Sequence, residues 1–327
     1  MKSKVVFYLI GISVFFSCGN HTEVVERSEK EYKVITDSIE SVMPGQLFVN
    51  ADYILWTNPF TTEKNVHILD KKMGNEILKI VNTGKGPEEF ITPSVGYVQD
   101  NKVFVFDLNS DKAAYYQLSA EGSSDVEFIK RDRQGETRYL EVSQGQLLSF
   151  NPLLEKPFKF NNEFWGKLPF DQSIKNNGSV SQGNILYNSD RQYLIYSTMS
   201  FSYLSIYQIK DGKINFISEK KKEFDYDIVD GEMKLNRKRK GASEMALTSD
   251  YIVTLERDYV TDDMDESTVG RDFTKLPHTV FLYDYDLNLK KILNLGMPIL
   301  RIAADPKENY LYAIGINPDF MIIKCDL

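Results

Sequence analysis

From Glu31 onward, short apolar runs alternate with turn residues, and hardly any stretch has the period of an amphipathic helix. β-Branched and aromatic residues dominate these runs, which suits the pleated, packed surface of a sheet. Turn dipeptides such as Asp100-Asn101 and Asp211-Gly212 separate them. The clearest strands are predicted at residues 53–56, 103–106, 193–196, 252–255, 280–283, 310–313 and 320–323. The pattern predicts an all-β fold.

The predicted strands group into six units that recur at intervals of about 45 to 60 residues. The units start near Leu47, Val95, Tyr139, Ile185, Met245 and Leu300. This period is typical of four-stranded propeller blades, so we expect a six-bladed β-propeller. The last unit has only three strands, and residues 33–36 are predicted to add the fourth as an outer strand that closes the ring. A jelly roll of two packed sheets is the alternative fold.

The first residues have the three parts of a signal peptide. Lys2 and Lys4 precede an apolar stretch of 12 residues, 5–16, and small residues follow around Cys18. A transmembrane helix needs about 20 apolar residues, so this stretch is too short to remain as a span. Residues 15–18 resemble the lipobox of bacterial lipoproteins, which implies cleavage before Cys18 and its acylation, palmitate included. The alternative is an ordinary buried cysteine in a secretory peptide.

These features predict the organisation of the chain. Residues 1–17 are the signal peptide, residues 18–30 are a linker behind the lipidated Cys18, and residues 31–327 are the propeller domain. Gly19 after the cysteine resembles the sorting signal for the outer membrane, and the domain would face the periplasm or the cell exterior. Loss of the signal peptide changes the formal net charge from −8 to −10, which argues against nucleic acid as a partner.

Cys325 is the only other cysteine, so the mature domain cannot form an internal disulfide. A chain of about 300 residues buries roughly 75% of its unfolded surface and needs no such crosslink. Strand alternation from Ile323 predicts that Cys325 is a buried hydrophobic side chain without a redox role.

A glycine-rich segment carries a family resemblance. It comprises Gly84, Gly86, Pro87, Glu88, Glu89 and Phe90, and Pro93, Asp107 and Asn109 follow it. This order resembles an NHL-type propeller repeat. It is more similar to the TolB-like six-bladed propeller lipoproteins of Gram-negative bacteria. The resemblance implies a fold and a location and little about activity, because propellers serve many functions.

Two interpretations of this motif loop stay open. In the structural one, Gly84 and Gly86 permit positive φ, Pro87 fixes a turn residue, and Phe90 fills a space between blades. In the functional one, Glu88 and Glu89 line one face and bind a cation or a basic partner. A phosphate loop is excluded, because no G-K-[ST] sequence follows.

Other candidate chemistry is sparse. The three histidines, His21, His67 and His278, match neither metal-site spacing nor a nucleophile elbow, so we predict no metal, cofactor or catalytic residue. The acidic run 262–266 is interpreted as a solvated loop, with calcium binding as the alternative, and the basic run 237–240 as a solvated hairpin edge. Ser38 lies in a short sequence that resembles an O-glycosylation acceptor.

The predicted function is a binding module, anchored to the membrane through Cys18, for a peptide, a protein or a glycan. Aromatic side chains at one mouth of the ring would suit such a ligand. The enzymatic alternative is a calcium-dependent propeller lactonase or lyase, and the third candidate is a structural subunit of an outer-membrane assembly. The scarcity of histidines favours binding over catalysis.

Overall fold

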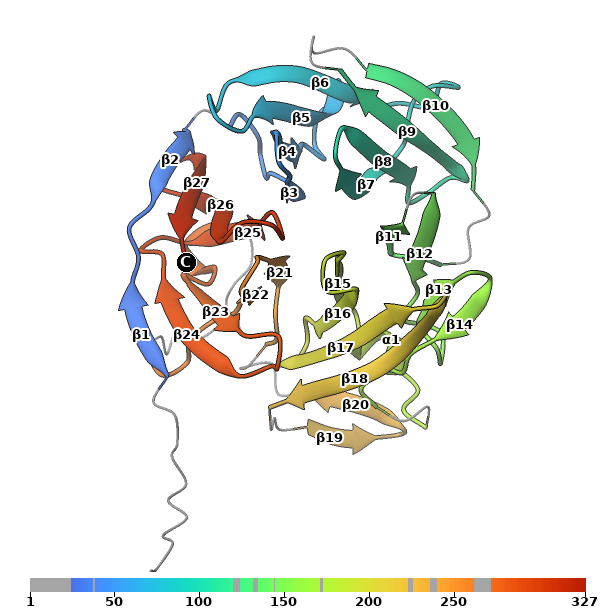
Figure 1. The fold of residues 1–327 in the computed structure, drawn as a ribbon, viewed down its shortest axis with the longest axis vertical. Helices are drawn as coiled ribbons and strands as arrows, with labels where there is room; N and C mark the ends of the chain where they lie inside the picture. The colour runs from blue at the N-terminus through green and yellow to red at the C-terminus, as the bar shows by residue number, and fades with distance from the viewer. Residues whose placement is uncertain are drawn as a thin grey trace, which may run out of the picture.

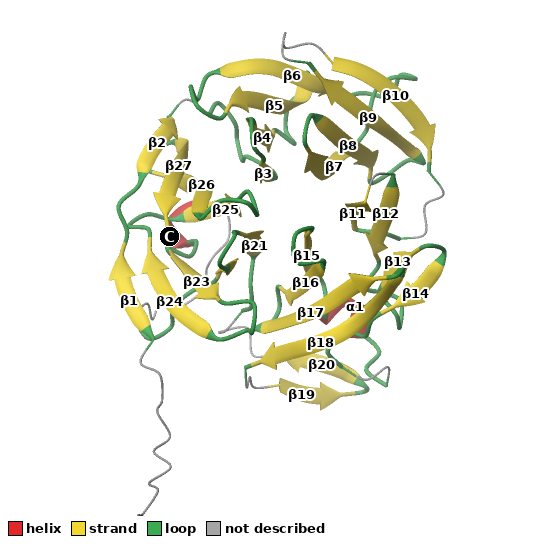
Figure 2. Cartoon of the chain, viewed as in Figure 1, coloured by secondary structure: helices red, strands yellow, loops and turns green. Residues whose placement is uncertain are grey.

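The computed structural model describes residues 25–37, 39–119, 124–131, 135–143, 145–170, 173–222, 226–235, 240–261 and 272–327. These residues form seven sheets, and the six larger ones are arranged around a central axis, as Figure 1 shows. Strands make up almost all of the regular structure (Figure 2). The predicted six-bladed β-propeller is confirmed.

Each blade begins at the inner end of its sheet and proceeds outward. The first blade comprises β3 (Leu47–Val49), β4 (Tyr53–Thr57), β5 (Lys64–Asp70) and β6 (Glu76–Asn82). The second comprises β7 (Pro93–Gln99), β8 (Lys102–Asp107), β9 (Lys112–Leu118) and β10 (Ser124–Lys130). The third comprises β11 (Arg138–Ser143), β12 (Gln146–Phe150), β13 (Phe158–Phe160) and β14 (Glu163–Trp165). All three start within two residues of the predicted positions.

The remaining blades follow the same order. The fourth comprises β15 (Gly183–Asn188), β16 (Tyr193–Thr198), β17 (Tyr203–Lys210) and β18 (Lys213–Lys221). The fifth comprises β21 (Glu244–Leu247), β22 (Ile252–Leu255), β23 (Thr279–Tyr283) and β24 (Leu289–Asn294). The sixth has β25 (Ile299–Ala303), β26 (Tyr310–Ile316) and β27 (Phe320–Asp326) from the C-terminal part of the chain.

The N-terminal segment closes the ring. Strand β2 (Lys33–Thr36) pairs antiparallel with β27 and supplies the outer strand of the sixth blade, as predicted. The structure adds a strand that the sequence did not predict, since β1 (Glu26–Glu29) lies in the expected linker and pairs parallel with β24 of the fifth blade. Arg27 also donates a hydrogen bond to the buried Asp258 carboxylate at 2.8 Å. One segment therefore fastens two neighbouring blades.

Two insertions lengthen the spacing between the later blades. A hairpin of β19 (Tyr226–Val229) and β20 (Glu232–Leu235) lies between the fourth and fifth blades. A 3₁₀ helix, Phe273–Lys275, lies between β22 and β23. The short helix α1 (Asn177–Val180) precedes the fourth blade. None of the described helices is long and apolar enough to cross a membrane.

The described core consists of a hydrophobic cluster between each pair of adjacent blades. This arrangement follows from the geometry of a propeller, because both faces of each sheet pack on a neighbouring sheet. Cys325 lies in the cluster between the fifth and sixth blades with 1% of its surface exposed, and burial raises its pKa to about 12. The prediction of a buried, unreactive cysteine agrees with this environment.

Candidate ligand-binding channel

The inner strands β3, β7, β11, β15, β21 and β25 surround a central channel with a volume of about 630 Å³. Each inner strand has a partner on only one side within its sheet. The backbone groups on its other edge therefore face the channel without a strand partner. A space of this volume is within the range that small ligands occupy.

Hydrogen bonds between blades show that the inner strands run in the same direction. Near the starts of the strands, the side-chain amide of Gln46 donates to the Val95 carbonyl oxygen at 2.9 Å, and Arg301 Nε donates to that of Gly45 at 2.6 Å. Near the ends, the side-chain amide of Asn50 donates to the Asp100 carbonyl oxygen at 2.6 Å. The channel thus has one end formed by strand starts and another formed by strand ends.

Three charged side chains gather where the strands start. Arg301 Nη1 lies 3.0 Å from a carboxylate oxygen of Glu244, and both side chains are one quarter exposed. Arg138, at the first position of β11, is half-buried and donates from Nη1 to the carbonyl oxygen of Thr137 at 3.0 Å. We call Arg138, Glu244 and Arg301 the arginine end of the channel.

The charges at the arginine end influence one another. Burial lowers the pKa of Arg138, Glu244 opposes this effect, and the positive charge of Arg301 adds to it. Burial raises the pKa of Glu244, and the two guanidiniums pull it in the opposite direction. Two guanidiniums therefore lie near one carboxylate, and among the described residues only Arg301 forms an ion pair with it. This partly desolvated space has a net positive charge.

The rest of the channel wall changes character along each strand. Leu140 follows Arg138 on β11 before the strand reaches Glu141, and on β25 Arg301 is followed by Ile302 and Ala303. At the other end lie Asp100, Glu141, Asp305 and Lys307. The Asp305 carboxylate is 3.6 Å from the buried Lys71 Nζ. The apolar side chains of Leu140, Ile302 and Ala303 are buried between blades, so the channel is positive at one end and rich in carboxylates at the other.

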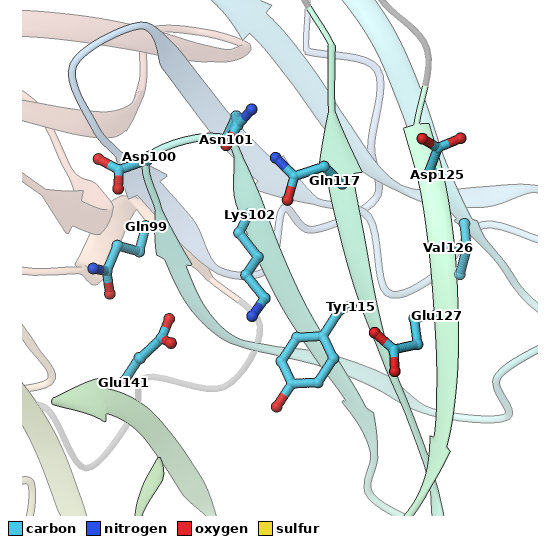
Figure 3. Close-up of a pocket in the computed structure, with 10 residues that line it drawn as sticks. All are labelled: Gln99, Asp100, Asn101, Lys102, Tyr115, Gln117, Asp125, Val126, Glu127 and Glu141. Atoms are coloured by element: carbon cyan, nitrogen blue, oxygen red, sulfur yellow. The ribbon is translucent and has the colours of Figure 1, made fainter. Parts of the chain in front are cut away.

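A polar pocket of about 690 Å³ adjoins the carboxylate-rich end, between the second and third blades. Gln99, Asp100 and Glu141 line both the pocket and the channel. Figure 3 shows the other charged groups, with Lys102 beside the Tyr115 ring and the carboxylates of Asp125 and Glu127 on β10. The Lys102 Nζ lies 4.1 Å from the centre of that ring. Four carboxylates and one lysine give the pocket a negative charge.

The motif loop joins β6 to β7, and its residues do not line the channel. The Glu89 carboxylate accepts a hydrogen bond from the Gly86 backbone N–H at 2.7 Å. Phe90 is fully buried in the cluster between the first and second blades. Pro87 and Glu88 are exposed, and Lys112 Nζ donates to the Gly86 carbonyl oxygen at 2.8 Å. These contacts favour the structural interpretation, since Glu89 binds the loop itself.

The expected role of the two glycines needs correction. Neither Gly84 nor Gly86 has positive φ. What Gly84 provides is space, because a Cβ atom there would lie 2.0 Å from a Glu89 carboxylate oxygen. Glycine here leaves room for the Glu89 carboxylate, which a larger residue would push away from its hydrogen bond with the Gly86 N–H.

Several predicted features lie outside the described residues. Cys18, Ser38, the acidic run 262–266 and residues 237–239 of the basic run are among them. His67 is described, and it stacks on Trp56 with ring centres 4.0 Å apart and contacts Glu76 Oε2 at 2.6 Å through Nδ1. In the described part of the chain, no three His, Cys, Asp or Glu side chains are grouped so that they could hold a metal ion.

Sequence reasoning missed the arginine end, although its signal was present. Arg138 and Glu244 each precede a predicted unit start, and Arg301 follows one. A charged residue at the predicted start of an inner strand is a signal for a residue that lines the channel. Only the closed ring brings three such residues together.

The comparisons with known proteins agree on the architecture. A family model described as a 6-bladed beta-propeller, DUF5128, matches residues 35–260. A Bacteroides fragilis protein described as exported has a similar structure, with a TM-score of 0.57 and 13% identity over 92% of this chain and 98% of that chain. At this identity the likeness shows the fold alone.

Two further solved structures match at lower similarity. The Cps50 (Swd1) propeller domain of Myceliophteria thermophila has a TM-score of 0.49 and 12% identity over 91% of this chain and all of that domain. Streptogramin B lyase has a TM-score of 0.49 and 11% identity over 91% of this chain and 87% of the lyase. No curated protein matches the sequence.

Proposed function

The chain belongs to the 6-bladed beta-propeller family, and we propose that it is an extracytoplasmic binding module whose ligand enters the central channel. The channel, lined by the inner strands of all six blades and charged at both ends, is the observation that carries this proposal. Its volume suits a short peptide, a glycan fragment or a side-chain segment of a protein partner.

The location rests on the N-terminal sequence. The lipobox around Cys18 and the similarity to TolB-like propeller lipoproteins support a lipid anchor in the outer membrane. More than one acyl chain is needed for stable membrane residence, which a diacylglycerol at Cys18 together with an N-acyl chain would supply. The mature protein should begin at acylated Cys18, and Cys18→Ala should leave the precursor uncleaved. An intact mass that corresponds to another N-terminus would contradict the anchor.

The test of the binding function uses a blocked channel. The mature domain would be screened against a tetrapeptide library and a glycan array, together with the variant Ala304→Trp. Ala304 is half-buried and lines the channel, so an indole there should obstruct it. We expect a ligand whose affinity falls at least tenfold in this variant. Leu153→Trp is the control, because Leu153 is 71% exposed and lies outside the channel.

Two results would contradict the proposal. One is that no peptide or glycan in either collection binds the wild-type domain. The other is that the ligands bind Ala304→Trp as tightly as they bind the wild type, while the melting temperatures show that both are folded.

The calcium-dependent enzyme stays the alternative, without an observation that favours it. A calcium ion takes six to eight oxygen ligands. The described residues offer no convergent group of three carboxylates.

A further inference from the structure

We propose that the channel binds a short, extended peptide with a free carboxyl terminus, and that Arg138 and Arg301 hold its carboxylate. This inference rests on the proposed function and names the ligand class of the same site. It comes from the charges and strand edges that line the channel.

The arginine end has hydrogen-bond donors and charge to offer. Arg301 is fixed by hydrogen bonds from Nε to Gly45 and from Nη1 to Leu300 and Glu244. Arg138 makes its hydrogen bond to Thr137 through Nη1, and a guanidinium carries five N–H donors in all. No carboxylate among the described residues forms an ion pair with Arg138. Because two guanidiniums lie near a single carboxylate, the site has a net positive charge that favours the binding of a second carboxylate.

A carboxylate suits this site better than a neutral polar group. Arginine binds carboxylates through paired N–H donors in a fixed plane, and these charge-assisted hydrogen bonds are stronger than neutral ones. The Arg301 side chain is also held before the ligand arrives, since it is anchored to the first blade through Gly45 and to the fifth through Glu244. Little conformational entropy would then be lost on binding.

The walls of the channel favour a peptide over a glycan. The inner edges of these strands have no strand partner, although Gln46 already occupies the N–H and carbonyl oxygen of Val95 on β7, and an extended peptide can pair its backbone with such an edge. The side chains of Leu140, Ala246 and Ile302 are buried between blades, so these strands face the channel mainly with their backbone groups. A peptide backbone matches such an edge with its own N–H and carbonyl groups, which a sugar lacks.

The opposite end of the channel sets the direction and the length of the peptide. Asp100 and Glu141 lie there and would face the ammonium group of the amino terminus. Glu141 lies three positions after Arg138 along β11, and Asp305 lies four positions after Arg301. At about 3.3 Å per residue these separations are about 10 to 13 Å, which three or four extended residues span.

The experiment is calorimetric titration of the mature domain with the tetrapeptide Ala-Leu-Ala-Leu, its carboxy-terminal amide and its amino-acetylated form. We expect the amide to bind about tenfold or more weakly, because it lacks the charge that the arginines hold. Acetylation should cost less, because the carboxylate-rich end is more open to solvent. Arg138→Gln should weaken the free acid by a similar factor and leave the weak amide unchanged. Lys307→Gln, which removes a positive charge at the opposite end, should not weaken the free acid.

The outcomes separate the inference from the proposed function. Equal affinity for acid and amide, or an equal loss for both in Arg138→Gln, would overturn the carboxylate contact. An acidic oligosaccharide that binds with dependence on Arg138, when the peptides do not bind, would overturn the peptide class and leave the binding function intact. Failure of every peptide and glycan to bind would overturn both.

Discussion

Phe90 offers the sharpest test of the motif loop, because the structural and functional interpretations assign opposite importance to Phe90 and Glu88. The Phe90 side chain has 0% of its surface exposed and packs in the cluster that joins the first two blades. Its ring centre lies 5.9 Å from that of Phe128. Phe90→Ala would remove these contacts and leave a cavity, at a cost of about 3–5 kcal/mol in the free energy of unfolding.

The change is large enough to measure by thermal unfolding. An unfolding entropy of about 2.1 cal/mol/K per residue gives about 0.6 kcal/mol/K for about 300 residues, so the melting temperature should fall by about 5–8 °C. Glu88→Ala is the matched control in the same loop, and since Glu88 is exposed its effect should stay within about 0.5 kcal/mol. Circular dichroism of the wild type and the two variants would report both values. A loss below about 1 kcal/mol for Phe90→Ala, or a larger loss for Glu88→Ala, would refute the structural interpretation.

Three further predictions concern the ring and its core. A chain that begins at Ile39 lacks β1 and β2, so several strand hydrogen bonds are lost at about 1 kcal/mol each and two sheet edges become open. This chain should melt at a lower temperature and self-associate, as measured by light scattering. An unchanged melting temperature and a monomeric protein would argue against closure of the ring by this segment. In a form that begins at Gly19, Cys325 should react with a thiol reagent in denaturant but not in the native state, because burial raises its pKa to about 12. Rapid labelling of the native protein would contradict this prediction. Burial lowers the pKa of His67 below 6.5, so near this pH the folded protein binds fewer protons than the unfolded chain. The contribution of His67 to the free energy of unfolding is therefore fully present above pH 6.5 and is lost as the pH falls below 6.5. His67→Phe should therefore flatten the fall in urea midpoint between pH 7 and pH 5, and an unaltered slope would assign that fall to other groups.

Much of the fold could be predicted because its determinants are local. Alternation of apolar and polar residues identifies strands, and turn residues separate them, so the blade starts near Leu47 and Tyr139 fall within two residues of their positions in the structure. The three-strand count after Leu300 predicted the closing strand β2 for the same reason. Strand β1 was missed, because Glu26–Glu29 is a polar sequence without strand alternation, and its pairing with β24 is decided by a partner about 265 residues away.

The candidate site could not be predicted in the same way. Arg138, Glu244 and Arg301 are single charged residues in three different units, and each is unremarkable in its own sequence context. Ring closure places them at one end of a single channel, where burial and neighbouring charges change the pKa values of Arg138 and Glu244. Conversely, the conspicuous motif loop is used for packing between blades, since Glu89 binds the loop backbone and Phe90 enters the core.

The sequence by itself determined the strands, their grouping into six blades and the strand that closes the last blade, because these depend on short-range patterns and on the count of strands. The tertiary structure decided which charges meet, how the Glu89 carboxylate packs beside Gly84 and which strand edges face the axis without a strand partner. Those properties depend on distances between residues far apart in the chain, and such distances exist only once the ring is closed.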